Sequence, residues 1–404
     1  MNDTAIIVGA GQAGAHAALA MRGSGYAGPV LLIGAEAERP HERPPLSKQM
    51  LTAAEEPPVA YFHAEPRYAE HGITLMLGTA VTSIHPQNRI VKLHDGRKLA
   101  YDKLLLTTGG RARRLTVPGG DRVLTLRTLD DARELRRRLL PGARVACIGA
   151  GVIGLEIASS AHERGCTVTV IEPADRVMGR TLAPEMSAWL AGLHRAAGVT
   201  VRLGTGVAAV AAQHVVCTDG SLVPTDVVIA GIGMERDTSL AEAAGVAVDD
   251  GVEVDEFGRT NMPGVYAAGD VAAFWVPRLQ RRMRLETWRH AQDHGTAVGR
   301  AMAGSGVPYD DVPWFWTDQL GVNLQVAGVC EGAATRILRG ELGAAAFAAW
   351  YLDAAGVPIG VAGVNAPREV RAGQGMIRAG RPVDPAKLSD VAITPQRLAT
   401  AVAL

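Results

Sequence analysis

Cysteine is scarce in this chain. Its 404 residues include four cysteines, which are widely separated and form neither a C-x-x-C pair nor a metal-ligand spacing. This pattern argues against a disulfide-stabilised secreted protein, predicts no metal site, and favours a reduced, cytoplasmic protein. One gap matters most for redox chemistry, because no cysteine lies between Gly14 and Cys147.

Net charge is also absent. The chain has 41 basic and 41 acidic residues, so any basic surface must be local and no nucleic-acid partner is expected. No uninterrupted apolar run approaches the roughly 18 residues that a membrane span requires. The N-terminus lacks the basic segment of a signal peptide, so we expect no membrane partner. Apolar residues make up 48% of the chain, which is enough for two or three domains with buried cores.

A strand–turn–helix pattern for a dinucleotide opens the chain. The apolar run 6–8 enters a G-x-G-x-x-G turn at Gly9, Gly11 and Gly14, and small helix-forming residues follow it. Gly9 permits the tight turn, Gly11 lets the backbone approach a pyrophosphate, and Gly14 lets the helix pack close to the strand. The helix N-terminus adds amide donors and a partial positive charge. By itself this motif indicates only a dinucleotide.

The same pattern returns later in the chain. A second apolar run enters a turn at Gly149, Gly151 and Gly154. The strand expected at 168–171 ends directly on Glu172, about 20 residues after the glycines. A carboxylate at this place binds the hydroxyls of an adenosine ribose and repels a 2′-phosphate, so the second copy favours NADH over NADPH. Arg176 nearby is the one counter-argument.

In the first copy the corresponding acid is displaced. The strand expected at 30–33 is followed by Gly34 and Ala35, and the nearest acid is Glu36. We expect either that Glu36 takes over the contact with the ribose or that the nucleotide there is held more weakly.

Other segments carry weaker signals. Three prolines make 39–48 a long rigid loop, which composition alone would interpret as a surface linker. The apolar run 104–106 ends in T-T-G-G, a small-residue turn that suits close approach of a cofactor. A short strand at 265–268 ends in Gly-Asp, and Asp270 could contact a ribityl or pyrophosphate group or only cap a turn.

Two regions indicate short strands without a fingerprint of their own. Residues 73–110 predict short strands with an Asp-Gly hairpin turn at 95–96. The C-terminal part predicts a small α+β domain. Its expected elements are strands at 322–329, 335–339, 345–351 and 357–364 and a helix near 366–379.

Taken in order, these motifs resemble one family. The first glycine turn, the loop sequence R-P-P-L-S-K, the second turn with Glu156, and Y-A-A-G-D ending at Asp270 are similar to the NADH-dependent ferredoxin reductases of bacterial oxygenase systems, of the biphenyl/toluene dioxygenase reductase and putidaredoxin reductase type. The resemblance covers essentially the whole chain, including W-F-W-T-D-Q at 314–319.

This resemblance implies an α/β, glutathione-reductase-like fold. Two Rossmann-type dinucleotide-binding domains would be joined by a C-terminal α+β domain. The implied boundaries are a discontinuous FAD-binding domain at 1–111 and 235–309, an NADH-binding domain at 112–234, and a C-terminal reductase domain at 310–404.

The resemblance also assigns the site residues, with FAD at the first glycine turn and NADH at the second. It implies catalytic roles for Lys48, near the flavin ring, and for Glu156, which would face the nicotinamide pocket and pair with Lys48. The other implied contacts with FAD or NAD are Gly9, Gly11, Ala13, Gly14, Glu36, Arg43, Val81, Thr108, Gly109, Arg127, Gly149, Gly151, Ile153, Gly154, Glu172, Gly233, Gly269, Asp270, Glu286, Thr287 and Trp288.

The implied activity is an NADH:ferredoxin oxidoreductase. A hydride would pass from NADH to FAD, and single electrons would then pass to a [2Fe-2S] ferredoxin that supplies a terminal oxygenase of aromatic hydrocarbon catabolism. Thiol-based relatives need cysteines soon after the first turn, and this chain has none there, so electrons must leave the flavin directly. Two alternatives stay open: an NADH oxidase or rubredoxin-type electron donor on the same scaffold, and a binding protein resembling apoptosis-inducing factor.

The sequence offers one candidate docking surface for ferredoxin. An iron–sulfur ferredoxin usually presents an acidic face, and the family reading puts the basic run before Trp288 near the flavin. Its members are Arg278, Arg281, Arg282 and Arg284. A charge run can equally be a solvated face, so both interpretations remain. A second, smaller cluster is Arg111, Arg113 and Arg114.

Overall fold

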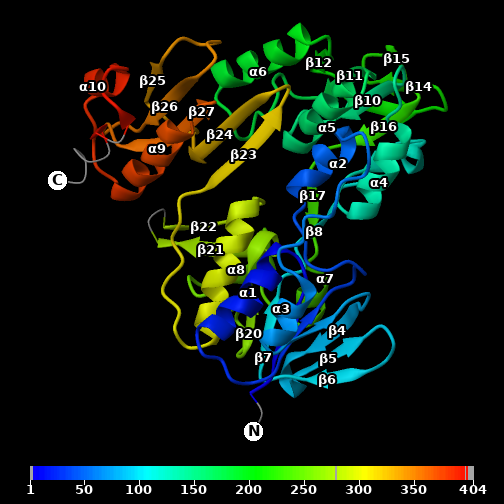
Figure 1. The fold of residues 1–404 in the computed structure, drawn as a ribbon, viewed down its shortest axis with the longest axis vertical. Helices are drawn as coiled ribbons and strands as arrows, with labels where there is room; N and C mark the ends of the chain where they lie inside the picture. Colours follow the sequence, from blue (N-terminus) through cyan, green and yellow to red (C-terminus); the bar gives the residue numbers. More distant parts are fainter. Residues whose placement is uncertain (1–2, 278–279, 396, 399–404) are drawn as a thin grey trace. The chain divides into compact units, whose positions relative to one another are not determined.

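The first glycine turn leaves the carboxyl end of a parallel sheet (Figure 1). The computed structural model describes residues 3–277, 280–395 and 397–398, and the chain divides into two units. Unit 1 is Met1–Glu42, Pro58–Arg111 and Met234–Asp311. Unit 2 is Arg43–Pro57, Ala112–Gly233 and Val312–Leu404.

The central sheet of unit 1 has the strand order β20-β7-β1-β2-β3, and all its pairs are parallel. Its strands are β1 (Ala5–Val8), β2 (Val30–Ile33), β3 (Ile73–Met76), β7 (Lys103–Leu106) and β20 (Val265–Ala267). Strand β1 is buried along its whole length, as expected for a parallel strand that is covered on both faces.

Two helices of unit 1 pack unusually closely. Helix α1 (Gln12–Gly23) follows the first glycine turn, and α8 (Trp288–Met302) lies against it. A Cβ on Gly295 would lie 2.3 Å from the Ala13 carbonyl oxygen, and one on Gly299 would lie 2.4 Å from the Ala17 carbonyl oxygen. These two glycines therefore let α8 approach the α1 backbone more closely than a side chain would allow.

Smaller sheets and short helices complete unit 1. A four-stranded sheet has the order β18-β19-β21-β22, and a three-stranded one the order β4-β5-β6. The Asp-Gly turn expected at 95–96 joins β5 to the antiparallel β6, with Gly96 at φ +87°. The elements are α3 (Glu65–Glu70), β4 (Val81–His85), η2 (Pro86–Asn88), β5 (Ile90–Leu93), β6 (Lys98–Ala100), β17 (Met234–Arg236), α7 (Ser239–Ala243), β18 (Val248–Asp249), β19 (Gly251–Val254), η4 (Gly269–Val271), β21 (Ala272–Val276) and β22 (Arg281–Met283). Strand β8 (Gly110–Ala112) pairs with β17.

Unit 2 contains a second parallel sheet, of order β12-β11-β10-β16-β9. The second glycine turn joins its strand β10 (Arg144–Ile148) to helix α5 (Val152–Glu163). The other elements of this part are η3 (Gly120–Arg122), β9 (Leu124–Thr125), α4 (Leu129–Arg138), β11 (Thr167–Glu172), α6 (Pro184–Ala196), β12 (Thr200–Leu203), β13 (Val207–Val210), β14 (His214–Cys217), β15 (Leu222–Pro224) and β16 (Val227–Ala230).

The C-terminal part of unit 2 is a five-stranded antiparallel sheet with helices. The strand order is β23-β24-β27-β26-β25. Each of the four strands and the helix expected there is confirmed to within two residues. The elements are β23 (Trp314–Gln319), β24 (Val322–Gly328), β25 (Thr335–Arg339), β26 (Phe347–Leu352), β27 (Pro358–Val364), α9 (Pro367–Ala379) and α10 (Pro385–Ser389).

The loop expected at 39–48 contains regular structure. Pro44–Ser47 form a 3-10 turn, η1, and the short helix α2 (Gln49–Thr52) follows it. The expectation of a purely irregular loop was wrong because proline, with its fixed φ, suits the first turn of a helix.

The predicted α/β class is confirmed by two parallel sheets entered by glycine turns and one antiparallel C-terminal sheet. The division into three domains stays a prediction, since the chain separates here into two units. Among the helices of the described residues, none is both long and apolar enough to cross a membrane.

Candidate functional site

In the first glycine turn, two glycines pack tightly against the protein and the middle one, Gly11, has free space beside it. Gly9 has a φ of +114°, and a Cβ there would lie 2.1 Å from the Thr107 carbonyl oxygen. A Cβ on Gly14 would lie 2.0 Å from the Gly9 carbonyl oxygen, so both positions require glycine. A Cβ on Gly11, whose backbone is extended, would meet no atom of the described residues within 4 Å. The turn therefore leaves space at Gly11 for a pyrophosphate.

Helix α1 begins beside this space with an uncapped N-terminus. Gly11 is its N-cap residue, and within the described chain α1 has no capping side chain and no acidic residue in its first turn. The first amide groups and the partial positive charge of the helix are therefore left for an anion. This end of unit 1 fits the pyrophosphate of FAD.

Asp270, far away in the sequence, lies close to the first turn. It follows Gly269 in η4, directly after β20. A Cβ on Gly269, which has a φ of +74°, would lie 2.8 Å from the Cβ of the buried Ala13. The Gly-Asp turn thus packs against the start of α1, where the expected contacts Ala13, Gly269 and Asp270 come together.

At the end of the first site where the adenosine ribose is expected, the structure establishes only backbone contacts of Glu36. Ala35 is exposed, whereas Glu36 is half-buried and its carbonyl oxygen accepts a hydrogen bond from the Gly78 amide at 2.9 Å. The contact of the Glu36 carboxylate with a ribose stays a prediction.

The other residues expected at FAD occupy the ends of elements in unit 1. Thr287 caps α8, its Oγ1 accepting from the His290 amide at 3.2 Å, and Trp288 is the first residue of that helix. Glu286 forms an ion pair with Arg284.

Three more expected contacts of unit 1 have structural partners. The Thr108 hydroxyl donates to the Asp237 carbonyl oxygen at 2.7 Å, and Gly109 next to it has a φ of +61°. Val81 begins β4 and packs against the core of unit 1. As cofactor contacts, these residues and 286–288 stay predictions.

The second glycine turn repeats the geometry of the first. Gly149 has a φ of +94°, and a Cβ there would lie 2.6 Å from the Gly231 carbonyl oxygen. A Cβ on Gly154 would lie 2.0 Å from the Gly149 carbonyl oxygen, whereas one on Gly151 would meet its nearest described atom only at 3.8 Å. Ile153, in the first turn of α5, is 42% exposed, and its contact with a nucleotide stays a prediction.

Glu172 ends β11 beside this second turn. Its Oε2 accepts from the Ala150 amide at 2.7 Å, and its Oε1 accepts from the Ala174 amide at 3.0 Å. The two backbone amides hold the carboxylate at the carboxyl end of the sheet, as an adenosine ribose requires. Arg176, which could have attracted a 2′-phosphate, donates instead to the Gly179 carbonyl oxygen at 2.8 Å.

Gly233 lies near the same turn. Its φ is +101°, and a Cβ on it would lie 3.8 Å from a guanidinium nitrogen of Arg180. Its carbonyl oxygen accepts from the Arg113 amide at 3.0 Å. Its contact with a nucleotide stays a prediction.

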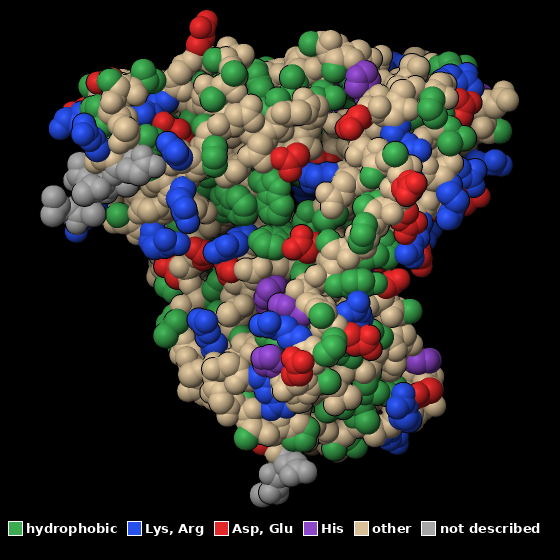
Figure 2. All heavy atoms as spheres, in the orientation of Figure 1, with side chains coloured by type: hydrophobic (Ala, Val, Ile, Leu, Met, Phe, Trp, Pro, Cys, Tyr) green, Lys and Arg blue, Asp and Glu red, His purple; other side chains and the backbone are tan. Residues whose placement is uncertain are grey.

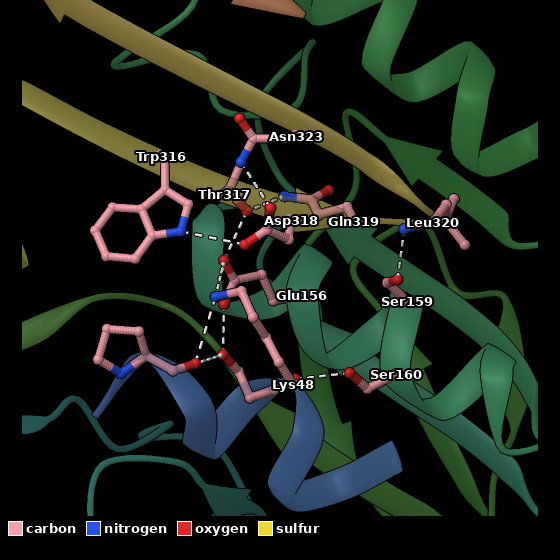
Figure 3. Close-up of polar contacts among 12 residues, drawn as sticks. Lys48, Glu156, Ser159, Ser160, Trp316, Thr317, Asp318, Gln319, Leu320 and Asn323 are labelled. Atoms are coloured by element: carbon pink, nitrogen blue, oxygen red, sulfur yellow. Dashed lines mark hydrogen bonds and ion pairs between the residues drawn. The ribbon is translucent and has the colours of Figure 1, made fainter. Parts of the chain in front are cut away.

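Lys48 and Glu156 form an ion pair in unit 2, as the family resemblance implied (Figure 3). Lys48 Nζ lies 2.8 Å from Glu156 Oε1, and the Glu156 side chain is 3% exposed. The Thr317 hydroxyl donates to the same carboxylate at 2.7 Å, and the Ser47 hydroxyl donates to its other oxygen. Three donors from two segments, 47–48 and β23, thus surround one buried carboxylate, which offsets the cost of removing its charge from water.

Further hydrogen bonds hold these segments together. Gln319 Nε2 donates to the Thr317 hydroxyl at 2.9 Å, and Gln319 Oε1 lies 2.8 Å from Nε2 of the buried His194 on α6. The Ser160 hydroxyl donates to the Ser47 carbonyl oxygen at 2.6 Å. Sequence reasoning missed Ser47 and Thr317, although both lie inside the motifs R-P-P-L-S-K and W-F-W-T-D-Q.

Arg43 and Arg127 are also brought together in unit 2. Arg43 donates to the Arg127 carbonyl oxygen, and the Arg127 amide donates to Asp131 Oδ2 at 2.9 Å. Asp131 belongs to the capping box of α4, which fixes the backbone at Arg127. Their contact with FAD stays a prediction.

The four cysteines are free, and burial keeps two of the thiols protonated. Burial raises the pKa of Cys147 to about 12, and burial with Glu185 nearby raises the pKa of Cys330 to about 12. Thiolates, the reactive form in disulfide exchange, are therefore not accessible at neutral pH at these two positions. Within the described residues, no group of three or more His, Cys, Asp or Glu side chains could hold a metal ion.

Comparison with known proteins gives consistent matches over the chain. The family model for pyridine nucleotide-disulphide oxidoreductases matches residues 3–295, and the one for the reductase C-terminal domain matches 314–399. The ferredoxin–NAD(+) reductase component of the p-cumate 2,3-dioxygenase system of Pseudomonas putida is 39% identical over 395 residues, which are 96% of each chain. Putidaredoxin reductase of Pseudomonas putida is 38% identical and is aligned over 97% of this chain and 96% of its own.

Solved structures agree. The crystal structure of the covalent putidaredoxin reductase–putidaredoxin complex superposes with a TM-score of 0.94 at 38% identity, over 100% of this chain and 99% of the other. A ferredoxin reductase from Rhodopseudomonas palustris gives a TM-score of 0.95 at 35% identity, over 98% of this chain and 100% of the other.

Proposed function

Because the chain belongs to the ferredoxin–NAD(+) reductases of the pyridine nucleotide-disulphide oxidoreductase family, we propose that it is an FAD-dependent NADH:ferredoxin oxidoreductase. The observation that carries this proposal is the pair of glycine turns, one in each unit. In each turn the first and last glycines pack against the protein, and the central glycine, Gly11 or Gly151, has free space beside it. Two dinucleotide sites in one chain are what an enzyme using both FAD and NADH needs.

The acceptor follows from the relatives and from the cysteines. One solved relative is held in a complex with putidaredoxin, and another is named a ferredoxin reductase. When bound, FAD supplies the step between a two-electron donor, NADH, and a one-electron acceptor. No cysteine lies between Gly14 and Cys147, so no thiol pair can intervene there. A [2Fe-2S] ferredoxin that supplies a terminal oxygenase is the acceptor we propose, and an NADH oxidase is not favoured.

The residues of the chain have distinct tasks in this proposal. The N-terminus of α1 would stabilise the negative charge of the FAD pyrophosphate, and Asp270 would contact FAD from η4. The second turn and Glu172 orient NADH. To Lys48, whose ammonium Glu156 holds, we assign the stabilisation of the negative charge of reduced flavin, a role that the family resemblance implies. NADH-driven reduction of a [2Fe-2S] ferredoxin, compared with oxygen consumption, tests the proposal.

Glu172 should decide between the two nicotinamide nucleotides. We expect Glu172→Ala to raise KM for NADH by about tenfold and to reduce the preference for NADH over NADPH by at least about tenfold, because it removes the carboxylate that binds the ribose and repels a 2′-phosphate. Steady-state kinetics with both nucleotides measures this. Glu163→Ala, at the exposed end of α5, is the matched control. An unchanged NADH/NADPH ratio would remove Glu172 from the site.

We also propose that ferredoxin docks on β22, with Arg281 as an exposed positive charge at the edge of the interface. Arg281 is exposed and makes no ion pair with the described residues. Arg282 and Arg284 have acidic partners in the same chain: Arg282 pairs with Glu253 at 3.3 Å, and Arg284 pairs with Asp250 and Glu286. Arg278 lies outside the described residues. On the face shown in Figure 2, basic and acidic side chains are interspersed, which fits a local docking patch better than a broad charged surface.

The docking proposal is tested at Arg281. Arg281→Glu should slow ferredoxin reduction about fivefold to tenfold at low salt and flatten its salt dependence, because a charge at the edge of an interface acts mainly on the association rate. NADH-driven reduction of ferricyanide should stay unchanged. Arg300→Glu, at an exposed position on α8, is the control. Equal ferredoxin rates in the two variants would contradict docking at β22.

A cytoplasmic location stays part of the proposal and is supported by the four free cysteines.

A further inference from the structure

Two histidines of α8 are buried in the core of unit 1. The side chains of His290 and His294 are 3% and 0% exposed. The His290 ring stacks on Phe274 with centroids 4.8 Å apart, and the His294 ring stacks on Tyr309, also at 4.8 Å. The two imidazoles lie 4.9 Å from each other. Both imidazoles are thus removed from water and packed against aromatic rings.

His294 accepts a hydrogen bond from the backbone of the proposed FAD site. The Gly269 amide donates to His294 Nδ1 at 3.3 Å, and His290 Nδ1 lies 3.1 Å from the Tyr309 hydroxyl. A backbone amide can only donate, so His294 Nδ1 must carry no hydrogen and the ring must be neutral. The Nε2 atoms of both histidines are buried without a hydrogen-bond partner among the described residues.

Gly269 is the residue that sets the position of Asp270. Its left-handed backbone and its close approach to Ala13 hold the Gly-Asp turn against the start of α1. We propose that His294 is a positioning residue for FAD: as a neutral acceptor it fixes the Gly269–Asp270 turn in the arrangement that binds the cofactor. This inference rests on the proposed assignment of the first glycine turn to FAD.

Protonation of His294 opposes this arrangement. A protonated Nδ1 would face the Gly269 amide donor to donor, and the added charge would have no partner at Nε2. The titratable or charged groups around the pair are His290 and Arg289 on α8, Asp293 on the same helix, Tyr309, and Asp311. Burial lowers the pKa of His290 to about 3, although a hydrogen bond with the Gly269 backbone and the charge of Asp311 act in the opposite direction. Burial, with His290 nearby, lowers the pKa of His294 well below its usual value.

The sign of the pH effect follows from these directions. When the turn is released and the histidines reach water, their pKa returns toward about 6.5. The released form therefore takes up protons below this pH, whereas the FAD-binding form does not. The affinity for FAD is therefore highest above pH 6.5. Below this pH the dissociation constant of FAD rises by up to about tenfold per pH unit for each histidine.

The dissociation constant of FAD, measured by flavin fluorescence at pH 8 and at pH 5.5, tests the proposal. For the natural protein, acidification should weaken FAD binding by about tenfold or more. His294→Gln keeps an uncharged acceptor that does not titrate, so it should bind FAD normally at pH 8 and reduce this acid effect by about tenfold. His294→Leu loses the acceptor and should weaken FAD binding about tenfold already at pH 8. His71→Gln, at an exposed histidine whose Nδ1 contacts the Arg67 carbonyl oxygen, is the control.

The outcomes separate this inference from the proposed function. A natural protein that does not bind FAD would contradict the function itself. FAD binding with the full acid effect kept in His294→Gln would overturn the positioning role, and so would unchanged FAD affinity of His294→Leu at pH 8. Since the Gln variant retains size and polarity, a failure of the Leu variant to fold leaves the test intact.

Discussion

Gly11→Val is expected to deplete the protein of FAD without unfolding it. The extended backbone of Gly11 accommodates valine, and a Cβ there meets no described atom within 4 Å, so the protein itself is not strained. The added side chain instead occupies the space that the pyrophosphate needs. We expect at least about a hundredfold loss of FAD affinity, since the backbone can no longer approach the phosphates. Flavin absorbance of the purified protein and FAD titration measure the loss.

Gly151→Val is the matched variant in the second turn. Its Cβ would lie 3.8 Å from the nearest described atom, so this change is equally tolerated by the protein. It should leave FAD in place and raise KM for NADH at least about tenfold. The two variants together assign one nucleotide to each turn. Loss of FAD from Gly151→Val, or full FAD content in Gly11→Val, would contradict the assignment of FAD to the first turn and NADH to the second.

A third glycine variant separates ligand effects from folding. Gly14→Ala would place a Cβ 2.0 Å from the Gly9 carbonyl oxygen. We expect this variant to lose stability as well as FAD, because the helix must move away from the turn. Circular dichroism of the three proteins therefore distinguishes a blocked site from a damaged fold.

Glu156→Leu should be the most damaging single change in unit 2. It leaves the Lys48 ammonium without its partner and removes the acceptor of the Ser47 and Thr317 hydroxyls (Figure 3). Breaking a fully buried pair costs about 3–5 kcal/mol, and we expect about 2–3 kcal/mol here because Lys48 keeps some access to water. Urea unfolding of the FAD-loaded protein measures this loss.

The same variant should slow the reduction of bound FAD by NADH at least about tenfold, because the Lys48 ammonium is no longer held in place. Stopped-flow absorbance follows this step. Glu156→Gln retains acceptors for the two hydroxyls and should lie between the natural protein and the Leu variant in stability and in rate.

The control for this prediction is another carboxylate with basic partners. Glu134 on α4 pairs with Arg137 and Arg138, but on the exposed surface. Glu134→Leu should change the free energy of unfolding by less than about 1 kcal/mol and leave the rate of FAD reduction unchanged. Equal effects of the two substitutions on unfolding and on FAD reduction would show that the burial of Glu156 contributes to neither.

Prediction from the sequence worked best where all residues of a structural motif lie in one short segment. The two glycine turns could be predicted because strand, turn and helix are consecutive, and because φ and close packing demand glycine at 9, 14, 149 and 154. Glu172 was predictable for the same reason, since its distance from the turn is set by one helix and one strand.

Contacts between distant segments could not be predicted. Gly295 and Gly299 look like ordinary helix-weakening residues until α8 is seen against α1. Ser47 and Thr317 both donate to Glu156 although they are more than 100 residues away from it in the sequence, one before and one after. No local sequence pattern predicts such hydrogen bonds.

The ion pairs of the basic run before Trp288 could not be predicted for a related reason, and ferredoxin docking at this run stays a prediction. In the sequence, Arg282 and Arg284 stand among other arginines, so they suggest a strongly positive patch. Their acidic partners Glu253 and Asp250 come from other segments and neutralise them. The net charge of a surface depends on such pairings, which only the fold supplies.

The most direct test counts electrons. Under anaerobic conditions, one NADH should reduce two molecules of a [2Fe-2S] ferredoxin, and a variant with all four cysteines replaced by alanine or serine should do so at a similar rate once its FAD content is matched. In air, without ferredoxin, NADH consumption should be slow. If the cysteine-free protein still reduces its FAD with NADH but no longer reduces ferredoxin, or if oxygen is consumed faster than ferredoxin is reduced, direct electron transfer from FAD to ferredoxin is contradicted.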